Sequence, residues 1–400
     1  MPEQPHYRIL LVHCRYRLPG GEDAVFEAER AMLQAHGHEV ITYERSNAEG
    51  GALQKLLLPF RAVFSFKTLR QVRALIRRHH IDVVHVHNTL LVISPSVFWA
   101  CFREGVPVVQ TLHNFRLFCP NGILLRDGAV CEDCPRHGLG CAVRHRCYRG
   151  SRAQSLVCAA VYAVHRWLGT YRRVNLIALT PFNRERLLAF NEQTRRPVLD
   201  PDRLFLKPNG IADPGIFPRP WRERENQIVF AGRLEELKGL RTAVEAWKLL
   251  GPDAPRLIVA GDGPLANWVR ENVPATVTLA GRVSHGALLD LLAASKAALC
   301  PSLCYEGQPL VPIEAHAVGT PVLASNLGNV GGAVEEGVDG LHFAPGDAAA
   351  LADAVRRLDA LGERLDPAAL RDRTLAAYGT EESYRRLMAV YREITGGQHQ

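Results

Sequence analysis

Residues 297–325, AALCPSLCYEGQPLVPIEAHAVGTPVLAS, decide the fold of the carboxyl half of the chain. The apolar run at 297–302 predicts a buried parallel strand, and residues 313–319 predict a helix that leads into a second strand at 321–325. Glu306 then lies in a strand-to-helix loop, and Glu314 lies in the first two turns of the helix. Ligands of open α/β sheets bind beyond the carboxyl ends of the strands, so both acids are expected to face one ligand.

The two acids and the helix N-terminus indicate the chemistry of that ligand. Carboxylates accept hydrogen bonds from hydroxyl groups, and the exposed amides at the start of a helix attract anions. A nucleoside diphosphate sugar (NDP-sugar) carries both kinds of group and fits this description.

Strands and helices alternate outward from this segment, which predicts an α/β protein with two doubly wound halves. In the carboxyl half, further strands are expected at 228–231, 257–260 and 277–280. In the amino half they are expected at 7–13, 40–43, 83–87 and 106–112. The Pro-rich, charged stretch 211–227 predicts a linker between the halves.

Length and composition agree with two domains. A chain of 400 residues exceeds what one hydrophobic core serves, and 47% hydrophobic with 22% charged residues is typical of globular proteins. We expect an amino-terminal domain at 1–210, which contains a Cys-rich insert at 115–150, and a carboxyl-terminal domain at 211–379. The start of the chain lacks a signal-peptide pattern and no apolar run reaches 18 residues, which predicts a soluble, intracellular protein.

An ordered set of motifs resembles the retaining glycosyltransferases of family 4. Their E-x7-E pair matches Glu306 and Glu314, and their donor-phosphate Arg and Lys match Arg233 and Lys238 in AGRLEELKG. The remaining matches are AGDGPL at 260–265, AGRVSHGAL at 280–288, KPNGI at 207–211, and RILLVHCRYRLPGGEDAV, VHVHN and TLHN in the amino half.

The resemblance implies the GT-B fold, in which two Rossmann-like domains face a central cleft and a last helix, here 380–395, packs back on the amino-terminal domain. It implies that the amino-terminal domain binds a lipid-linked or glycan acceptor, that the carboxyl-terminal domain binds an NDP-sugar donor, and that there is no catalytic metal. The implied catalytic residues are His113, Arg233, Lys238 and Glu306, and the implied donor-binding residues are Gly20, Gly21, Gly232, Gly261, Gly263, Arg282, Gly307, Gln308, Leu310 and Glu314.

The sequence departs from the family at one place. Many members have Phe-Gly where this chain has Gln308-Pro309, and Pro309 has no N–H to donate. One backbone contact to the donor is therefore missing from the expected set. The pyrophosphate is expected to depend more on Arg233, Lys238 and the amides of Gly307 and Leu310.

Three pieces of the pattern also have plainer interpretations. Gly20 and Gly21 open a predicted helix and suit either backbone approach to an anion or a tight turn. His113 directly follows a strand, where a histidine alone is often structural. The D-x-D letters at 200–202 precede the strand LFLKPN, far from the expected phosphate site, and are interpreted as a chance match rather than a metal site.

The amino half is basic and suggests a membrane partner. Residues 1–210 carry 29 Lys and Arg against 17 Asp and Glu, and residues 60–80 carry six cations and no acid. Leu69, Val72 and Ile76 fall on one helical face beside several arginines, as in helices that bind anionic lipid. The alternative is a solvated helix that packs on the sheet.

The insert at 115–150 contains a cysteine cluster. Cys119, Cys131, Cys134 and Cys147 have the spacing C-x11-C-x2-C-x12-C, with Cys141 as a fifth candidate. The CxxC unit and two flanking thiolates predict one structural zinc site, and free or redox-active thiols and disulfides remain alternatives.

Other functional classes fit less well. Residues 261–266 match the dinucleotide fingerprint G-x-G-x-x-A of oxidoreductases, but Pro264 falls in the turn and Arg282 lies near the place of the expected acid. A nucleic-acid-binding protein is not expected, because few aromatics accompany the basic residues. Among GT-B enzymes, epimerases and phosphorylases remain alternatives to a transferase.

Overall fold

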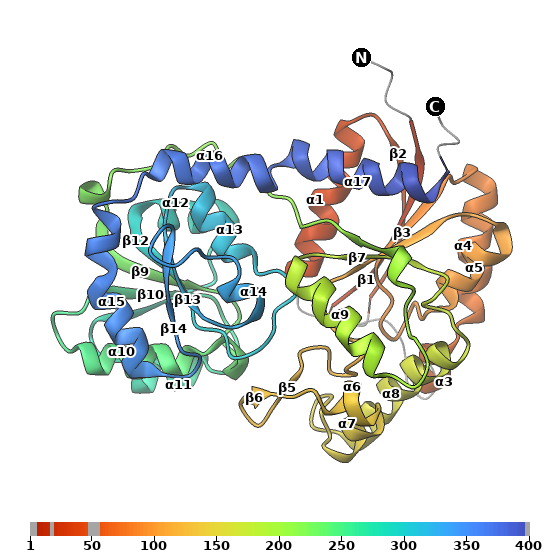
Figure 1. Cartoon of the computed structure of the whole chain (residues 1–400), viewed down its shortest axis with the longest axis horizontal. Helices are drawn as coiled ribbons and strands as arrows, with labels where there is room; N and C mark the ends of the chain where they lie inside the picture. Colours follow the sequence, from red (N-terminus) through yellow and green to blue (C-terminus); the bar gives the residue numbers. More distant parts are fainter. Residues whose placement is uncertain (1–5, 17–19, 47–56, 397–400) are drawn as a thin grey trace. The chain divides into compact units, whose positions relative to one another are not determined.

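The computed structural model describes residues 6–16, 20–46 and 57–396 of the chain. Residues 17–19, within the motif RILLVHCRYRLPGGEDAV, lie outside the described residues. The chain divides into two compact units (Figure 1). Unit 1 comprises Met1–Leu124, Cys131–Gly210 and Thr380–Gln400, and unit 2 comprises Leu125–Val130 and Ile211–Gly379.

Unit 1 is built on a parallel sheet with the strand order β2-β1-β3-β4-β7-β8. The sequence predicted the first four strands in chain order and the strand that contains LFLKPN, but not β7. Its short, fully buried segment offers no alternating pattern. The strands are β1 (Arg8–Arg15), β2 (Glu39–Ser46), β3 (Val83–Asn88), β4 (Val108–Leu112), β7 (Asn175–Ala178) and β8 (Leu204–Leu206).

The last helix, α17 (Thr380–Ile394), contributes to the core of unit 1. Its Tyr384, Leu387 and Tyr391 are buried in one cluster with Ile9 of β1 and Phe26 of α1 (Gly21–Ala35). The Tyr391 hydroxyl also bonds the His85 Nδ1 at 2.9 Å. The apolar stripe expected on residues 380–395 is therefore the face by which α17 packs on the unit 1 sheet and α1.

The remaining helices of unit 1 surround its sheet, with Ser65 and Ser151 capping α4 and α8. A two-stranded antiparallel hairpin, β5 (Leu125–Arg126) and β6 (Ala129–Val130), belongs to unit 2. The helices are α3 (Leu58–Val63), α4 (Phe66–His79), α5 (Ser96–Glu104), α6 (Asp133–His137), α7 (Gly140–Arg144), α8 (Arg152–Trp167) and α9 (Pro181–Gln193).

Unit 2 repeats the architecture with the strand order β11-β10-β9-β12-β13-β14, again parallel. The five strands expected from the sequence are present, and β14 was not predicted. The strands are β9 (Glu225–Ala231), β10 (Arg256–Ala260), β11 (Val277–Gly281), β12 (Ser295–Cys300), β13 (Val322–Ser325) and β14 (Gly340–Phe343).

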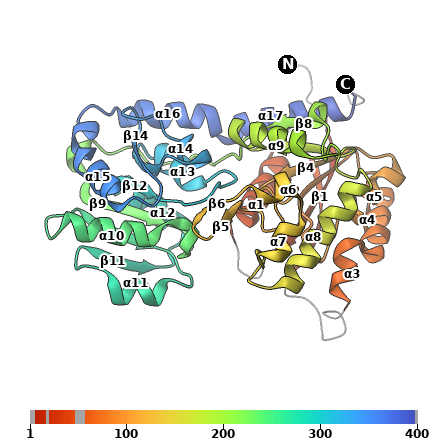
Figure 2. The same cartoon turned by 60° about the horizontal axis from the view of Figure 1, so that its bottom comes forward.

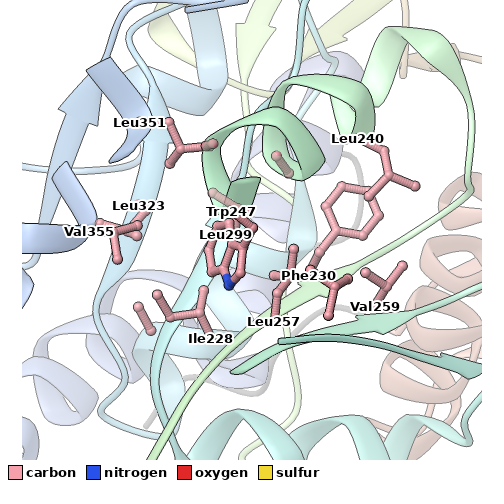
Figure 3. Packing of buried hydrophobic residues seen from close by; sticks show 14 of the residues in the cluster. Ile228, Phe230, Leu240, Trp247, Leu257, Val259, Leu299, Leu323, Leu351 and Val355 are labelled. Atoms are coloured by element: carbon pink, nitrogen blue, oxygen red, sulfur yellow. The ribbon is translucent and has the colours of Figure 1, made fainter. Parts of the chain in front are cut away.

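Alternating side chains of the unit 2 strands enter two cores. Ile228 and Phe230 of β9 join one cluster with Trp247, whereas Val229 between them joins the other. Figure 3 shows Trp247 among strand residues of the first cluster. Its Nε1 donates to the Pro255 carbonyl at 2.7 Å, so its polar atom is satisfied. Because helices cover both faces of the sheet, its strands are apolar on both sides. The ligand is therefore expected beyond the carboxyl ends of the strands.

The unit 2 helices are α10 (Leu240–Leu250), α11 (Ala266–Asn272), α12 (His285–Ala294), α13 (Leu310–Ala317), α14 (Gly328–Gly331), α15 (Ala348–Gly362) and α16 (Pro367–Tyr378). Within the part of the chain that the structure describes, none of the helices combines the length and the apolar character that crossing a bilayer requires.

Candidate active site

Lys238 and Glu306 form an ion pair beyond the carboxyl ends of two neighbouring strands of unit 2. Lys238 ends the 3₁₀ turn Glu236–Lys238 that follows β9, and Glu306 lies in the loop after β12. The Lys238 Nζ donates to the Glu306 Oε2 at 2.7 Å, and the Ser302 hydroxyl donates to the other carboxylate oxygen. Two residues 68 positions apart are thus brought together at the predicted site.

A glycine makes this approach possible. Gly239 adopts φ +70°, and a Cβ on it would lie 1.8 Å from the carbonyl oxygen of Pro301. The Leu303 N–H also donates to the Leu237 carbonyl at 2.8 Å. The turn that carries Lys238 is therefore packed directly against the loop that carries Glu306, and only glycine fits at the contact.

Both members of the pair are ionised at neutral pH. Burial acts to lower the pKa of Lys238, but the Glu306 carboxylate outweighs it and the Lys238 pKa is raised. Burial likewise acts to raise the pKa of Glu306, but Lys238 and the Ser302 hydroxyl lower it overall. The site therefore holds a fixed positive and a fixed negative charge with little net charge.

Glu314, the second acid of the E-x7-E motif, is buried on α13. Its Oε1 lies 2.9 Å from the Nε2 of His285, the first residue of α12. The loop between the acids is fixed by Asn329, whose amide donates to the carbonyls of Glu306 and Gly307. His285 and Asn329 are contacts that the sequence did not predict.

The two predicted arginines are more exposed than Lys238. Arg233 follows β9 and bonds Glu235 at 2.9 Å, with 45% of its side chain exposed. Arg282 lies 3.5 Å from Asp262 and is 66% exposed. Exposed pairs of this kind contribute little to stability, so both guanidinium groups can change partner when an anion binds.

Two of the predicted donor-binding glycines, Gly261 and Gly263, are required by close backbone contacts. A Cβ on Gly261, which adopts φ +149°, would lie 1.8 Å from the Gly232 carbonyl oxygen. A Cβ on Gly263 would lie 2.6 Å from the Leu234 carbonyl oxygen. The turns after β9 and β10 therefore pack backbone to backbone, which accounts for G-x-G-x-x-A without a dinucleotide.

Pro309 stands at the start of α13. Pro309 is the N-cap residue of the helix, whose first residue is Leu310. The N-cap position therefore supplies no N–H, whereas Leu310 retains one. Gly307 and Gln308 precede it in the loop.

In unit 1, His113 ends a chain of buried polar groups. The His113 Nε2 lies 3.1 Å from the His87 Nδ1, and the His87 Nε2 lies 3.1 Å from the Glu29 Oε1. Glu29 also accepts from the Lys207 Nζ at 2.6 Å, and the His85 Nδ1 lies 2.9 Å from it. These groups come from β3, α1 and the segments after β4 and β8.

The network assigns the tautomer of His113. Burial lowers the pKa of His87 to about 4 and that of His113 well below its usual value, so both rings are neutral at pH 7. Burial alone would raise the pKa of Glu29, but Lys207 and the neighbouring histidines lower it. The ionised Glu29 accepts from His87 Nε2–H, so His87 Nδ1 accepts from His113 Nε2–H, which leaves His113 Nδ1 as an acceptor.

Gly20 and Gly21 start α1 without steric need for glycine. Gly20 is extended, with φ −141°, and a Cβ on either residue would meet nothing within 4 Å. The Gly20 N–H donates to the Asp23 carboxylate at 2.9 Å. Contacts with the described residues therefore do not explain why glycine stands at either position.

Family models match both halves of the chain. Residues 19–211 match Glycosyltransferase Family 4, and residues 225–360 match Glycosyl transferases group 1. The chain belongs to this glycosyltransferase family. The site described above lies within the matched residues.

Named relatives agree with the assignment. A D-inositol 3-phosphate glycosyltransferase from Catenulispora acidiphila is 34% identical over 344 residues, which cover 79% of this chain and 73% of the relative. A glycogen synthase from Mycobacterium tuberculosis is 32% identical over 308 residues, 74% of this chain. The match spans 63% of the length of that glycogen synthase.

Solved structures share the GT-B fold. A glycosyltransferase from Rickettsia africae superposes with a TM-score of 0.68 at 17% identity and covers 97% of this chain and 98% of its own. Anabaena Alr3699/HepE in complex with UDP and glucose superposes with a TM-score of 0.65 at 16% identity and covers 97% of this chain and 100% of its own. The predicted fold class, two Rossmann-like domains, is confirmed.

The cysteine cluster of the glycosyltransferase does not form the predicted four-ligand set. Cys119 and Cys134 are in side-chain contact, and the amides of residues 121, 122 and 124 bond the Cys119 sulfur. Among the described residues, the potential metal ligands that converge within 4.8 Å are Glu29, His85 and His87, so Cys131 and Cys147 do not complete a site.

The Glu29, His85 and His87 group is itself a poor metal site. The Lys207 ammonium occupies one Glu29 oxygen at 2.6 Å, and a divalent cation there would meet like charge. Glu29 was missed by the sequence analysis. The sequence did contain a sign of a buried acid. Glu29 lies between Phe26 and Leu33 on the apolar face of the predicted helix EDAVFEAERAML.

Proposed function

We propose that this glycosyltransferase moves a sugar from an NDP-sugar to a lipid-linked or polysaccharide acceptor with retention of the anomeric configuration. The observation that carries the proposal is the ion pair of Lys238 with Glu306, which lies in the loop that leads into the helix of the buried Glu314. A cation that can meet a diphosphate and two acids that can meet hydroxyl groups lie beyond adjacent strand ends, and β12 leads into the helix that carries Glu314.

Different residues of the site bind different parts of the NDP-sugar. Lys238 and Arg233 bind the diphosphate and stabilise the negative charge that develops on the leaving nucleotide. Glu306 accepts from hydroxyls of the transferred sugar, and Glu314 accepts from the ribose hydroxyls. The amides of Gly307, Gln308 and Leu310 contribute donors at the start of α13. Lys238 already donates to Glu306. When the NDP-sugar binds, the ammonium of Lys238 stays charged and its N–H groups are shared between the Glu306 carboxylate and the diphosphate.

The proposed reaction needs no enzyme nucleophile. The bond from the sugar C1 to the phosphate oxygen breaks while the acceptor oxygen forms a bond to C1 on the same face. The acceptor proton passes to the departing phosphate oxygen. Glu306 and Glu314 are assigned to hydroxyl binding, in contrast to the paired carboxylates that flank the bond in retaining glycosidases.

His113 is proposed to orient the transferred sugar. Its Nδ1 is an acceptor because Glu29 and His87 fix the opposite nitrogen as a donor. An acceptor nitrogen fits a sugar hydroxyl. Glu29 acts only through His87, so Glu29 is a positioning residue in this proposal.

Membrane contact is proposed for the outer face of α3 and the start of α4. The structure corrects the predicted lipid face, because Leu69, Val72 and Ile76 are buried and Arg73 and Arg77 both bond Glu104. The exposed apolar groups are instead Phe60 and Phe66, at 76% and 68%.

A neighbouring helix extends this face. The His165 Nε2 of α8 lies 2.8 Å from the Val63 carbonyl of α3, and α3 and α8 lie side by side in Figures 1 and 2. Trp167 at the end of α8 is 73% exposed. Aromatic side chains with nearby cations, here Arg61 and Lys67, are the composition of an interfacial membrane anchor.

Vesicle flotation tests the membrane proposal. Replacing both Phe60 and Phe66 by serine should reduce co-flotation with anionic vesicles at least severalfold. The change Phe217→Ser is a matched control, because Phe217 is 88% exposed in unit 2. Equal flotation of all variants would contradict the proposed surface.

A donor and acceptor screen tests the proposed reaction. The purified protein is incubated with single NDP-sugars and polyprenyl diphosphate-linked glycans, and nucleotide release and the product anomer are measured. We expect one nucleotide series to support acceptor-dependent release with retained configuration. An inverted product, or no release with any donor, would contradict the assignment.

A further inference from the structure

Arg116 has buried donors without acceptors. It lies in unit 1, three residues after His113 in the segment that follows β4, and the residue is partly exposed. Its Nε and Nη1 are buried and have no hydrogen-bond partner among the described residues. A buried donor without a partner destabilises the folded state, more so when it is charged, so such groups in native proteins call for an explanation.

The acid nearest to Arg116 does not supply the missing partner. The Glu22 carboxylate accepts from the Asn114 Nδ2 at 2.9 Å and from the Asn88 Nδ2 at 3.3 Å. Burial raises the Glu22 pKa, with Arg116, Tyr16 and Asn114 acting in the opposite direction. Glu22 thus accepts from side-chain amides and from the Tyr16 hydroxyl, and it does not accept from the Arg116 Nε or Nη1.

The other neighbours are neutral phenols. Tyr16, Tyr162 and Tyr148 lie around the Arg116 guanidinium. Burial raises the pKa of each of them, so they carry no charge at neutral pH. Apart from Glu22, the groups that surround the Arg116 guanidinium are therefore neutral phenols.

The segment around Arg116 holds the guanidinium in place. The Arg116 N–H donates to the Asn114 Oδ1 at 3.1 Å, and the Phe115 N–H donates to the Gly122 carbonyl at 3.0 Å. Gly122 adopts φ +86°, and a Cβ there would lie 2.9 Å from the Arg116 Cγ. The returning chain packs on the side chain, so the charge is positioned before any ligand binds.

Arg116 and its neighbours lie beyond the carboxyl ends of the unit 1 strands. Asn88 ends β3, His113 and Asn114 follow β4, and Glu22 lies in the first turn of the helix after β1. The carboxyl ends of these parallel strands are where α/β sheets bind ligands. Arg116 therefore lies with the polar groups expected to meet the substrate.

We propose that Arg116 binds an anionic group of the acceptor, either the phosphate of a diphosphate-linked carrier or the carboxylate of an acidic sugar. This inference rests on the proposed function, because it assigns the acceptor to unit 1. The shared chemistry is an anionic oxygen that accepts from guanidinium N–H groups, which form strong charge-assisted hydrogen bonds with phosphate and carboxylate.

Calorimetry with simple anions tests the proposal. Inorganic pyrophosphate and glucuronate are titrated into the full-length protein carrying Arg233→Ala and Lys238→Ala, which removes the cations assigned to the donor. We expect at least one probe to bind. Adding Arg116→Met should weaken that binding at least tenfold, whereas Arg172→Met, an exposed arginine of the same unit, should change it less than twofold.

The probes separate the two ligand sources. Pyrophosphate alone would indicate a diphosphate-linked acceptor, and glucuronate alone an acidic sugar. No binding of either probe, or equal binding by the Arg116→Met variant, would overturn the proposal. If Arg116-dependent binding is found but no NDP-sugar supports transfer, the proposed function fails and the anion site stands.

Thermal unfolding distinguishes a ligand site from a structural role. Without ligand, Arg116→Met should melt at the same temperature as its parent or higher, because the change removes a buried charge without a partner. A melting temperature several degrees lower would show that the Arg116 charge stabilises the fold internally, which would contradict the proposal.

Discussion

At the scale of single residues, the positive charge of Lys238 is expected to act in catalysis. Replacing Lys238 by alanine should lower turnover at least 100-fold, because the leaving diphosphate loses a buried cation. Initial rates of nucleotide release measure this effect. Lys248→Ala on α10 is the control, since that lysine forms an exposed pair with Glu245 and should leave turnover unchanged. Equal rates for the Lys238→Ala variant and the unaltered protein would refute its assignment.

Glu314 should affect nucleotide affinity. Glu314→Gln keeps the volume of the buried side chain but weakens acceptance from ribose hydroxyls, so the dissociation constant of the nucleoside diphosphate should rise about 10-fold or more. Calorimetric titration measures it. The exposed Glu363→Gln serves as a control in the same unit. An unchanged affinity in Glu314→Gln would place the ribose elsewhere.

The sequence could predict the charged residues of the site but not their supports. Lys238 and Glu306 lie in the segments that follow β9 and β12, and Glu314 lies on the helix after β12, so their places beyond the carboxyl ends of these strands follow from the alternation of elements. Asn329 and His285 reach the same loop and helix from other elements, and only the packing of unit 2 brings them there.

At the scale of elements, the contact between the Lys238 turn and the Glu306 loop depends on Gly239. Gly239→Ala would place a Cβ against the Pro301 carbonyl and push the two loops apart. We expect turnover to fall at least tenfold while the far-ultraviolet circular dichroism stays native.

Gly105→Ala is the matched control for this change. Gly105 has nearly the same backbone angles, φ 70° and ψ 18° against φ 70° and ψ 21°, but a Cβ there meets nothing within 4 Å. It shares the backbone strain, which destabilises by about 1 kcal/mol, without the collision. If both variants lost turnover equally, strain rather than loop contact would explain the effect.

Elements with strong periodicity were predicted well, and short buried ones were not. The strands β7 and β14 have four residues each and carry no alternation that separates them from loops. The face of α4 was predicted correctly as apolar, and of its two predicted partners, lipid and protein, the structure shows protein. Leu69, Val72 and Ile76 pack inward, because a helix face cannot show from sequence whether protein or lipid covers it.

At the scale of the whole molecule, buried neutral histidines should make the stability depend on pH. Burial lowers the pKa of His38 and of His87 to about 4, against about 6.5 in an unfolded chain. Between these values the unfolded state binds more protons, so the unfolding free energy rises with pH there. The stabilisation is complete above pH 6.5 and is lost as the pH falls towards 4, by on the order of a few kcal/mol for each group.

Denaturant unfolding between pH 4 and 7 measures this slope. His38 accepts from the Tyr7 N–H at 3.1 Å and contacts the Tyr384 hydroxyl, so His38→Asn should flatten the slope as well as lower the stability. His137→Asn, at an exposed position, should leave the slope unchanged. A pH-independent unfolding free energy in the unaltered protein would contradict the neutral state of the buried rings.

The most direct test of the whole account is a thermal-shift screen against UDP, GDP, ADP, CMP and their sugars, with NAD as a control. We predict that one nucleotide series raises the melting temperature of the unaltered protein and that Lys238→Ala and Glu314→Gln abolish most of that rise. Saturating ligand at 100 times its dissociation constant stabilises by about 2.7 kcal/mol, which is readily measured. A rise with NAD alone, or a nucleotide response that both variants retain in full, would contradict the NDP-sugar site.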